Sequence, residues 1–477
     1  MAFNSLKFFL VFPLIFGIHW AIPAKYNQWR KVFLIVASYL LYMNWKPAFA
    51  LVLFGVTLVT YWGGQILSLD REVESLEFDA RKKRKRLAWL FALLGLLPLL
   101  VFKYYNFLNN SISDGLAAIG LQFSLLGLNW AVPVGISFFT FQAVGYMLDV
   151  YHERIKAENN FIDYVLFVSF FPQIASGPIS KADELLPQIK KERVFDYNQA
   201  VSGLKYLLWG MFLKVVLADR AGIYVDTVFG SYEKFSGISC AIASVLYSIQ
   251  IYADFAGYSL MAVGIAKTLG FKLINNFKRP YFATSITEFW KRWHISLTRW
   301  LTQQVYIPLG GSRCSKIKNY WNILVTFLVS GIWHGANWTF IVWGIIHGIL
   351  QIIEKTLGWN KKESKGFVKA MRIFFTFIIV TLAWVIFRSS SILDAFAFMG
   401  RYFASEGHAI EGIQTLLYVL LALIPVVALE ICQEYFNKFY SRIMSKVIIR
   451  WILYLSLLSL IVLIGVHDGS SFIYVSF

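Results

Sequence analysis

The chain has 477 residues, of which 58% are hydrophobic and 15% are charged. Soluble globular proteins carry about 25% charged residues, so this composition, with its repeated apolar runs of membrane-spanning length, excludes a soluble protein and indicates a polytopic membrane protein. The formal net charge is +18. Nucleic-acid binding is the weaker interpretation of this charge, because Lys and Arg cluster in short loops between apolar runs, as in cytoplasmic loops that contact anionic lipid. The three cysteines match no zinc or redox spacing.

The first half of the chain contains four apolar runs, at residues 6–22, 32–42, 48–67 and 87–102. The first run lacks a small-residue cleavage site, so we expect a retained helix rather than a removed signal peptide. The polar loop at 69–86 ends in six consecutive Lys and Arg residues. So dense a basic run predicts a loop on the cytoplasmic side of the membrane.

Two further apolar runs are interrupted by residues that break helices. The run at 130–150 contains Pro133 and Gly135, and the run at 161–179 contains two prolines and a glycine. Backbone that faces lipid must satisfy its hydrogen bonds internally, so such breaks are tolerated only inside protein. We therefore predict that both runs are broken or re-entrant and line a cavity within the protein.

The second half of the chain carries a strongly basic segment at 267–319, which holds ten Lys and Arg residues against one acidic residue and is therefore predicted to be cytoplasmic. Apolar runs lie around it at 203–217, 237–258, 319–353, 373–387, 413–429 and 451–466. We expect an all-α polytopic membrane protein with roughly eleven transmembrane helices. Re-entrant and interfacial helices complete one domain, residues 1–477, because no soluble domain fits between the runs.

The run at 319–353 contains no Asp, Glu, Lys or Arg and, at 35 residues, is too long for one crossing of about 20 residues. We predict two apolar helices that meet at Gly335-Ala336-Asn337, because Gly and Asn tolerate backbone geometries that a helix interior excludes. His334 lies immediately before this break. An ionisable group deep in an apolar run indicates a functional site; the alternative is a histidine that packs and bonds to a neighbouring helix.

Two more histidines are candidates. Residues 289–301 predict an amphipathic helix at the membrane surface, with His294 at the rim of its aromatic face beside Trp290. The alternative for His294 is a simple interfacial role. His347 lies 13 residues after His334, which is about 220° around a continuous helix. The two would face apart unless the break reorients them.

Other polar and small residues have structural explanations beside the functional ones. Asp254, at the end of an apolar run, could orient a histidine, but a helix cap or local hydrogen bond explains it equally well. Two Gly-x-x-x-Gly pairs, which begin at Gly331 and Gly344, permit close helix approach and need no chemistry.

Several classes of site are absent from the sequence. There is no P-loop, dinucleotide fingerprint, H-E-x-x-H metal pair or G-x-S-x-G elbow, and no two histidines are spaced i, i+4. Few acids lie in the apolar runs, which argues against an ion-coupled transporter. We therefore expect no metal, and either histidine-centred acid–base chemistry or a non-catalytic transporter or scaffold subunit.

Several motifs together carry a family resemblance. YADFAGYS (252–259), NFKRPYFATSITEFWKRWHISLTRWL (276–301), YIPLGG (306–311) and GIWHGANWTFIVWGIIHG (331–348) form its core, at about 252–348. WHIS followed about 40 residues later by WHGA is specific as a combination. VPVGISFFTFQ, FFPQIASGPI, the start MAFNSLKFFLVFPLIF and the closing SFIYVSF extend it. The chain resembles the membrane-bound O-acyltransferase family, in its bacterial polysaccharide O-acetyltransferase branch, over nearly its whole length.

The resemblance implies a ring of helices around a central tunnel in the bacterial inner membrane. It implies that His334 is the catalytic histidine and that His294 is the second motif histidine near the same tunnel. An acyl thioester, acetyl-CoA or an acyl carrier protein, would donate on the cytoplasmic side, with no tightly bound cofactor. A periplasmic partner would complete transfer to a polysaccharide. We place further residues along the substrate path, namely Trp333, Asn337, Trp290, Asp254 and His347.

The sequence departs from the family pattern in two places. Thr302-Gln303-Gln304 replaces a charged stretch before YIPLGG, and Leu260 replaces an Asp after GYS. Both changes remove charge near the expected cytoplasmic mouth, which bears on the donor and partner more than on the chemistry. Transfer of D-alanine or of a longer acyl chain by the same fold is the alternative enzymatic function.

Overall fold

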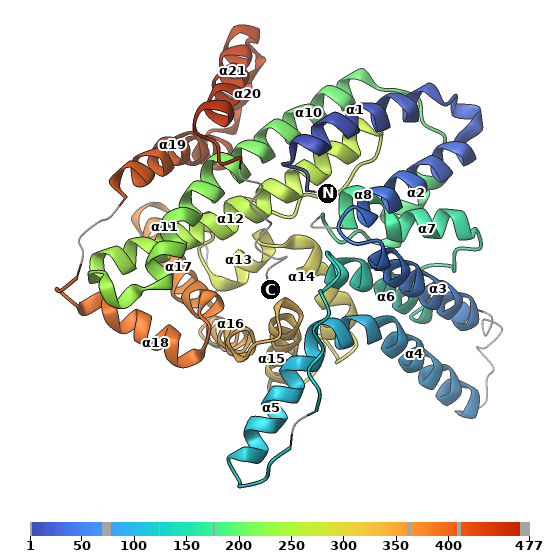
Figure 1. Ribbon diagram of the computed structural model, residues 1–477, viewed down its shortest axis with the longest axis horizontal. Helices are drawn as coiled ribbons and strands as arrows, with labels where there is room; N and C mark the ends of the chain where they lie inside the picture. Colours follow the sequence, from blue (N-terminus) through green and yellow to red (C-terminus); the bar gives the residue numbers. More distant parts are fainter. Residues whose placement is uncertain are drawn as a thin grey trace. The chain divides into compact units, whose positions relative to one another are not determined.

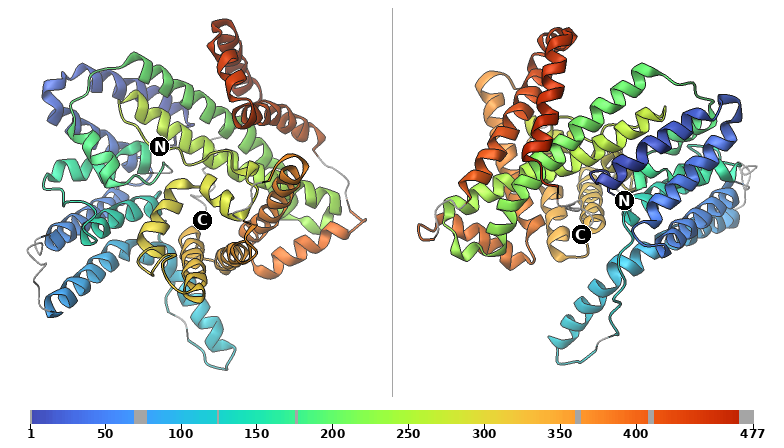
Figure 2. Two further views of the ribbon diagram at one scale, coloured as in Figure 1. Left: turned by 180° about the vertical axis from the view of Figure 1, so that it is seen from behind. Right: turned by 45° about the horizontal axis from the view of Figure 1, so that its top comes forward.

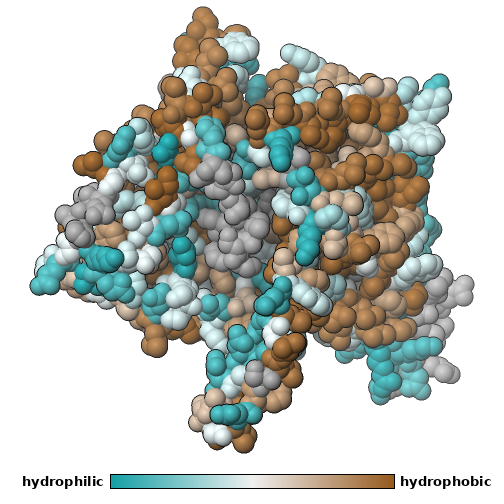
Figure 3. Space-filling model, viewed as in Figure 1, coloured by the Kyte–Doolittle hydropathy of each residue, from teal (hydrophilic) through white to brown (hydrophobic). Residues whose placement is uncertain are grey.

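The computed structural model describes residues 2–68, 78–123, 125–174, 177–359, 364–407 and 412–467. Helices joined by loops make up this part of the chain, which confirms the all-α prediction (Figure 1). The closing SFIYVSF motif, residues 175–176 of FFPQIASGPI and residues 69–77 of the predicted loop at 69–86 lie outside the described residues, and the basic run at 81–86 belongs to a helix that begins at Phe78. Apolar side chains cover wide areas of the visible surface (Figure 3), as expected of a protein that contacts lipid.

Seven helical segments of the described chain are long and apolar enough to cross a membrane: Ala48–Ser68, Asp79–Ala117, Tyr197–Gly230, Gly237–Thr268, Gly366–Arg388, Ile413–Tyr435 and Val447–Ile464. Leu6–Ala21 and Ala24–Met43, bent by 106°, make an eighth if they form one broken span. The protein is therefore multi-pass, with fewer spans by length and composition than the roughly eleven expected. Several apolar runs form helices that are too short to cross a membrane. The two helices of the run at 319–353 are long enough but contain too many polar residues to count as spans.

The contacts divide the chain into two compact units, each with its own interior. The first unit comprises residues 6–203 and 265–274. Its helices are α1 (Leu6–Ala21), α2 (Asn27–Met43), α3 (Ala48–Ser68), α4 (Phe78–Leu99), α5 (Tyr105–Ala117), α6 (Ile136–Tyr151), α7 (Phe161–Ser169), α8 (Phe171–Ile174) and α9 (Ala182–Lys190). The prediction of one domain over the whole chain stays a prediction.

Both interrupted runs of the first unit are broken, as predicted. Gly135 adopts a left-handed conformation directly before α6, and the second run divides into α7 and α8. The amide of Gln142 bridges the two runs: its Nε2 donates to the Phe167 carbonyl over 2.6 Å, and its Oε1 accepts from the Ser180 N–H over 3.2 Å. A buried side chain thus satisfies backbone groups that the break exposes.

A long arm also belongs to the first unit. The helical segment Asp79–Ala117 has 39 residues and includes both α4 and α5. The chain then returns along α5, held by Asn106 and Asn109, whose side-chain amides each exchange two hydrogen bonds with the backbone of Leu128 and Leu125 respectively. Figures 1 and 2 show α5 and this returning segment as a projecting pair.

The second unit comprises residues 2–5, 204–264 and 275–477. Its helices are α10 (Tyr197–Met211, which begins in the first unit), α11 (Asp219–Gly230), α12 (Gly237–Thr268, which ends in the first unit), α13 (Ile286–Arg292), α14 (Ile295–Leu301), α15 (Lys316–His334), α16 (Trp338–Thr356), α17 (Gly366–Arg388), α18 (Ile392–Gly400), α19 (Ile413–Tyr435), α20 (Asn437–Ser445) and α21 (Val447–Ile464). Its core is rich in aromatic residues, and the indole rings of Trp293, Trp343 and Trp384 are fully buried.

The predicted break in the apolar run at 319–353 is present. α15 ends at His334, residues 335–337 are not helical, and α16 begins at Trp338. The two helices pack closely, as the glycine spacing predicts, because a Cβ added to Gly331 would lie 3.4 Å from the Gly344 Cα. The break and the close packing place the end of α15 against the first two turns of α16, at Phe340 and Trp343.

The single amphipathic helix predicted at 289–301 is wrong in one respect. α13 ends at Arg292, Trp293 is extended, and His294 adopts a left-handed conformation with φ 42° before α14 begins. Phe289, Trp290 and Trp293 are buried and Trp300 is half-buried, whereas His294 is fully buried and not at the predicted rim. Hydrogen bonds from a distant segment cause the interruption: the Lys278 N–H donates to the Arg292 carbonyl, and the Ile295 N–H donates to the Asn276 carbonyl.

Candidate functional site

His334 lies at the last residue of α15, inside an aromatic shell. Its ring is 4.9 Å from Trp333, 5.0 Å from Trp343 and 5.3 Å from Phe387, measured between ring centroids. The side chain is 1% exposed. The helix break positions it there, because α16 folds back so that Trp343 covers the imidazole.

His294 reaches the same shell from the break between α13 and α14. Its ring centroid is 4.6 Å from Phe255 of α12 and 5.5 Å from Trp333. Both motif histidines therefore contact the same indole, Trp333. Burial lowers the pKa of the His294 imidazole to about 3, because a charged ring would lose its hydration. His294 is therefore neutral at pH 7 and can exchange hydrogen bonds, but it cannot supply a positive charge.

His347 is fully buried on α16 and contacts Trp343, with 4.8 Å between the ring centroids. The break thus reorients it, because His334 and His347 now contact the same indole. The Trp290 Nε1–H donates to His347 Nδ1 over 3.2 Å. Indole N–H groups only donate, so Nδ1 must accept, and the proton of the neutral ring lies on Nε2. Trp290 therefore fixes the tautomer of His347.

Asn337 and Asp254 have structural partners. Asn337 is the N-cap of α16: its Oδ1 accepts from the Thr339 N–H over 3.0 Å, and its Nδ2 donates to the Ser390 carbonyl over 2.9 Å. Asp254 belongs to a buried ion cluster in which Lys214 Nζ lies 2.6 Å from Asp254 and 2.7 Å from Asp219. Next to Asp254, Phe255 is the residue that contacts His294.

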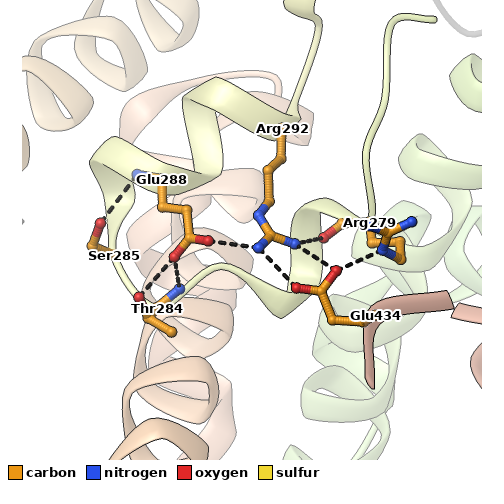
Figure 4. A network of polar contacts seen from close by, with 6 residues as sticks. All are labelled: Arg279, Thr284, Ser285, Glu288, Arg292 and Glu434. Carbon is orange, nitrogen blue, oxygen red and sulfur yellow. Dashed lines mark hydrogen bonds and ion pairs between the residues drawn. The ribbon is translucent and has the colours of Figure 1, made fainter. Parts of the chain in front are cut away.

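Two carboxylates from other helices hold α13, Glu354 at its start and Glu434 at its end, and neither was predicted from the sequence. Glu354, near the end of α16, accepts hydrogen bonds from the Ile286 and Thr287 N–H groups at the start of α13. At the other end, Arg292 bridges Glu288 and Glu434, at 2.6 and 2.9 Å (Figure 4). Glu354 lies seven residues after His347 and therefore on the same helix face. This seven-residue spacing is the signal in the sequence that could have predicted Glu354 on the same face as His347.

Further hydrogen bonds fix the start of α13. Ser285 is its N-cap and accepts from the Glu288 N–H over 3.0 Å, while Glu288 Oε2 accepts from the N–H and hydroxyl of Thr284 (Figure 4). Burial alone would raise the pKa of Glu288, but the bonds from Thr284 and the ion pair with Arg292 lower it below the usual 4.5. The carboxylate is therefore held in its charged form.

The arrangement suits acid–base chemistry in a buried aromatic environment. Three buried imidazoles contact the two indoles of Trp333 and Trp343, and the unprotonated nitrogen of a neutral imidazole can act as a general base. In the described part of the chain, no three His, Cys, Asp or Glu residues gather closely enough to hold a metal ion. Five residues of this shell were predicted from the sequence, namely His294, His334, His347, Trp333 and Trp290. Phe255, Trp343 and Phe387 were not, because no spacing rule distinguishes them from core aromatics.

Comparison with known proteins identifies the family. Residues 152–393 match the sequence model of the membrane-bound O-acyltransferase family. The chain is 36% identical over 409 residues to the probable alginate O-acetylase AlgI of Pseudomonas syringae pv. tomato, an alignment that covers 85% of this chain and 75% of that one. It is 33% identical over 399 residues to the peptidoglycan O-acetyltransferase of Helicobacter pylori, covering 78% and 73%.

A more distant similarity extends to another activity. The chain is 28% identical over 337 residues to the teichoic acid D-alanyltransferase of Streptococcus thermophilus, covering 65% of this chain and 77% of that one. The family match spans α7 to α17 and includes all three buried imidazoles of the shell. The aromatic shell, the multi-pass helical fold and these matches agree, and the chain belongs to the membrane-bound O-acyltransferase family.

Proposed function

We propose that this enzyme moves an acetyl group from a cytoplasmic thioester across the bacterial inner membrane for O-acetylation of a cell-surface polysaccharide, with His334 as the general base. The names of its relatives support the acetyl group and the glycan acceptor, because they act as an alginate O-acetylase and a peptidoglycan O-acetyltransferase. The observation that carries the residue assignment is the convergence of His334 and His294 on Trp333 at a helix break.

The chemistry follows from a neutral imidazole in low dielectric. An unprotonated nitrogen of His334 takes the proton of an acceptor hydroxyl as its oxygen bonds to the thioester carbonyl carbon. The carbon–sulfur bond then breaks, and the thiolate takes the proton from His334, so the imidazole returns to its neutral form. His294, neutral and in contact with Trp333, is suited to position the acyl donor rather than to attract its charge.

Access to His334 requires movement of an aromatic side chain. The imidazole is 1% exposed, whereas reacting atoms must approach to about 3–3.5 Å. Trp343 and Phe387 contact the ring, so one of them must move when a thioester enters. In our proposal they border the tunnel that joins the two membrane sides. Chemistry inside the membrane then moves only the small acyl group, since coenzyme A and a carrier protein are too polar to cross hydrocarbon.

The basic segment at 267–319 supports a thioester donor on the cytoplasmic side. Its ten Lys and Arg residues against one acid attract the phosphates of acetyl-CoA or the acidic surface of an acyl carrier protein. No tightly bound cofactor is needed for this reaction. A periplasmic partner protein would complete transfer to the polysaccharide.

Replacement of the proposed base tests the assignment. His334→Ala should lower the acetyl content of the surface polysaccharide at least about a hundredfold, while the amount of protein in the membrane stays unchanged. His19→Ala is the matched control, because His19 is also fully buried but lies on α1, in the other unit. Near-normal acetylation by the His334 variant would refute the base assignment.

D-alanyl transfer is the second candidate, and the similarity to a teichoic acid D-alanyltransferase is the observation that favours it. Purified protein offered acetyl-CoA, an acetylated carrier protein or a D-alanylated carrier protein separates the two functions. Release of thiol from an acetyl donor alone supports acetyl transfer. Release of thiol from the D-alanylated carrier alone would replace acetyl transfer with D-alanyl transfer as the function. In either case, loss of thiol release in a folded His334→Ala protein would support His334 as the base.

A further inference from the structure

Glu354 is a buried carboxylate that does not belong to the aromatic shell. It is 8% exposed and lies in the last turn of α16. It accepts three hydrogen bonds, from the Ile286 N–H at 2.5 Å, the Thr287 N–H at 2.9 Å and the Thr287 hydroxyl at 2.8 Å. A buried charge is tolerated when its oxygens are satisfied in this way, and a carboxylate is stabilised at a helix N-terminus.

The face of α16 that carries Glu354 also carries His347 and Trp343. These residues are spaced by four and seven positions, so they share one side of the helix. All three contact α13: Glu354 binds its first residues, His347 accepts from Trp290, and Trp343 packs on Trp290 with 5.6 Å between ring centroids. α13 therefore lies along α16, held at its start by charge and farther along by aromatic rings.

His294 depends on the position of α13, because it follows the last residue of that helix by two positions. The connection is short and constrained, since the Trp293 N–H still bonds to the Phe289 carbonyl and the Ser296 N–H bonds to Asn276 Oδ1. A shift of α13 along α16 would therefore displace the His294 turn from one side, against the Asn276 contacts that hold it on the other.

We propose that Glu354 is a positioning residue for acyl transfer, which acts through α13 to hold the His294 imidazole against Trp333, beside His334. This inference rests on the proposed function, in which His334 is the base and His294 positions the donor. Misplacement of a positioning group by about 1 Å can cost a hundredfold in rate. Loss of Glu354 should therefore reduce the rate without removing any group that touches the substrate.

Graded variants test the first part of the proposal. Glu354→Ala removes all three acceptor contacts, Glu354→Gln keeps one acceptor oxygen, and Thr287→Val removes only the hydroxyl donor. We expect kcat for acetyl-CoA-dependent thiol release to fall at least tenfold in Glu354→Ala, severalfold in Glu354→Gln and less than threefold in Thr287→Val. KM should change less than twofold in all three variants. Glu233→Ala, at an exposed position of the same unit, should leave kcat unchanged. If Glu354→Ala does not fold, the other two variants and their order decide the result.

A double-mutant cycle separates positioning from loss of stability. In a His294→Ala background, Glu354→Gln should lower kcat less than twofold, because the imidazole on which it acts is gone. The same fold-change in both backgrounds would overturn the proposal, because it would show that Glu354 does not act through His294. Unchanged kcat in a folded Glu354→Gln protein would also overturn it.

The cycle also distinguishes failure of this inference from failure of the proposed function. If His334→Ala retains activity, the base assignment fails, yet coupling between Glu354 and His294 would still support the positioning role. If His334→Ala is inactive but the cycle shows no coupling, the base assignment stands and only the positioning role is lost.

Discussion

The two helix breaks that place the motif histidines differ in what causes them. The break after His334 contains Gly335 and is capped by Asn337, so its determinants are local. The break at His294 contains no glycine and requires a left-handed histidine. It is held instead by residues 276 and 278, which pair with the backbone on both sides of it. A turn that places a motif histidine is therefore encoded locally in one case and imposed by a distant segment in the other.

The local break depends on close contact between α15 and α16, so an added methyl group there should have the largest effect. A Cβ on Gly344 would lie 2.4 Å from the Phe327 carbonyl oxygen, and a backbone atom cannot move aside easily. We expect Gly344→Ala to destabilise the protein by about 3 kcal/mol, the upper part of the range for overpacking. The fraction of folded protein in detergent and its melting temperature measure this.

Gly17→Ala is the control for that substitution, because a Cβ at Gly17 would meet nothing within 4 Å. Its melting temperature should stay the same or rise, since Ala favours a helix over Gly. Equal melting temperatures for the two variants would contradict the close packing of α15 on α16.

Two asparagines allow the breaks to be compared directly. Asn276→Ala removes the acceptor of the buried Ser296 N–H, which should cost about 1–3 kcal/mol. Asn337→Ala removes a helix cap, which should cost about 1 kcal/mol. We therefore expect Asn276→Ala to lower both stability and acetylation more. A larger loss for Asn337→Ala in chemical or thermal unfolding would mean that the two breaks are held alike.

The left-handed conformation at His294 can be separated from its imidazole. Asn tolerates φ > 0 better than other non-glycine residues, whereas a β-branched residue is strained there. His294→Asn should keep nearly normal amounts of membrane protein but lose most acetylation, and His294→Val should lose both. Immunoblots of membranes beside acetyl measurements distinguish these outcomes. Full acetylation by the Asn variant would show that only the turn matters.

The smallest expected effect concerns pH and Glu288. Its pKa is lower in the folded protein than the usual 4.5, so the charged form stabilises the fold above that pH, and the contribution is lost as the pH falls through the folded value. The melting temperature should therefore fall as the pH is lowered below about 4.5. Glu288→Gln should flatten this dependence. An unchanged slope in the variant would exclude Glu288 as its source.

The sequence predicts features that nearby residues determine. The apolar runs predict most of the long helices, Gly335 and Asn337 predict the end of α15, and Gly331 and Gly344 predict its crossing with α16. Features that depend on distant partners were missed. Nothing in the sequence near His294 indicates that Asn276 accepts hydrogen bonds from the backbone N–H groups of Ile295 and Ser296.

The burial of Glu354 was also not predicted, because its partners lie 67 and 68 residues earlier in the chain. Trp343 and Phe387 were missed for a different reason. Aromatic residues are frequent in this chain, and only the folded structure distinguishes those that cover an imidazole. By length and composition, the described residues contain seven or eight spans against the roughly eleven expected, partly because α1 and α2 are each shorter than 18 residues and count at most as one broken span.

The length of the helical segment Asp79–Ala117 has a practical consequence. Its 39 residues extend about 58 Å, nearly twice the hydrocarbon thickness of about 30 Å. The basic run at 81–86 is predicted to be cytoplasmic, so we expect the opposite end of the segment, α5, on the other side of the membrane. An antibody fragment that binds α5 would test this expectation, because it should bind from outside the cell, and it would also mark the protein for electron microscopy.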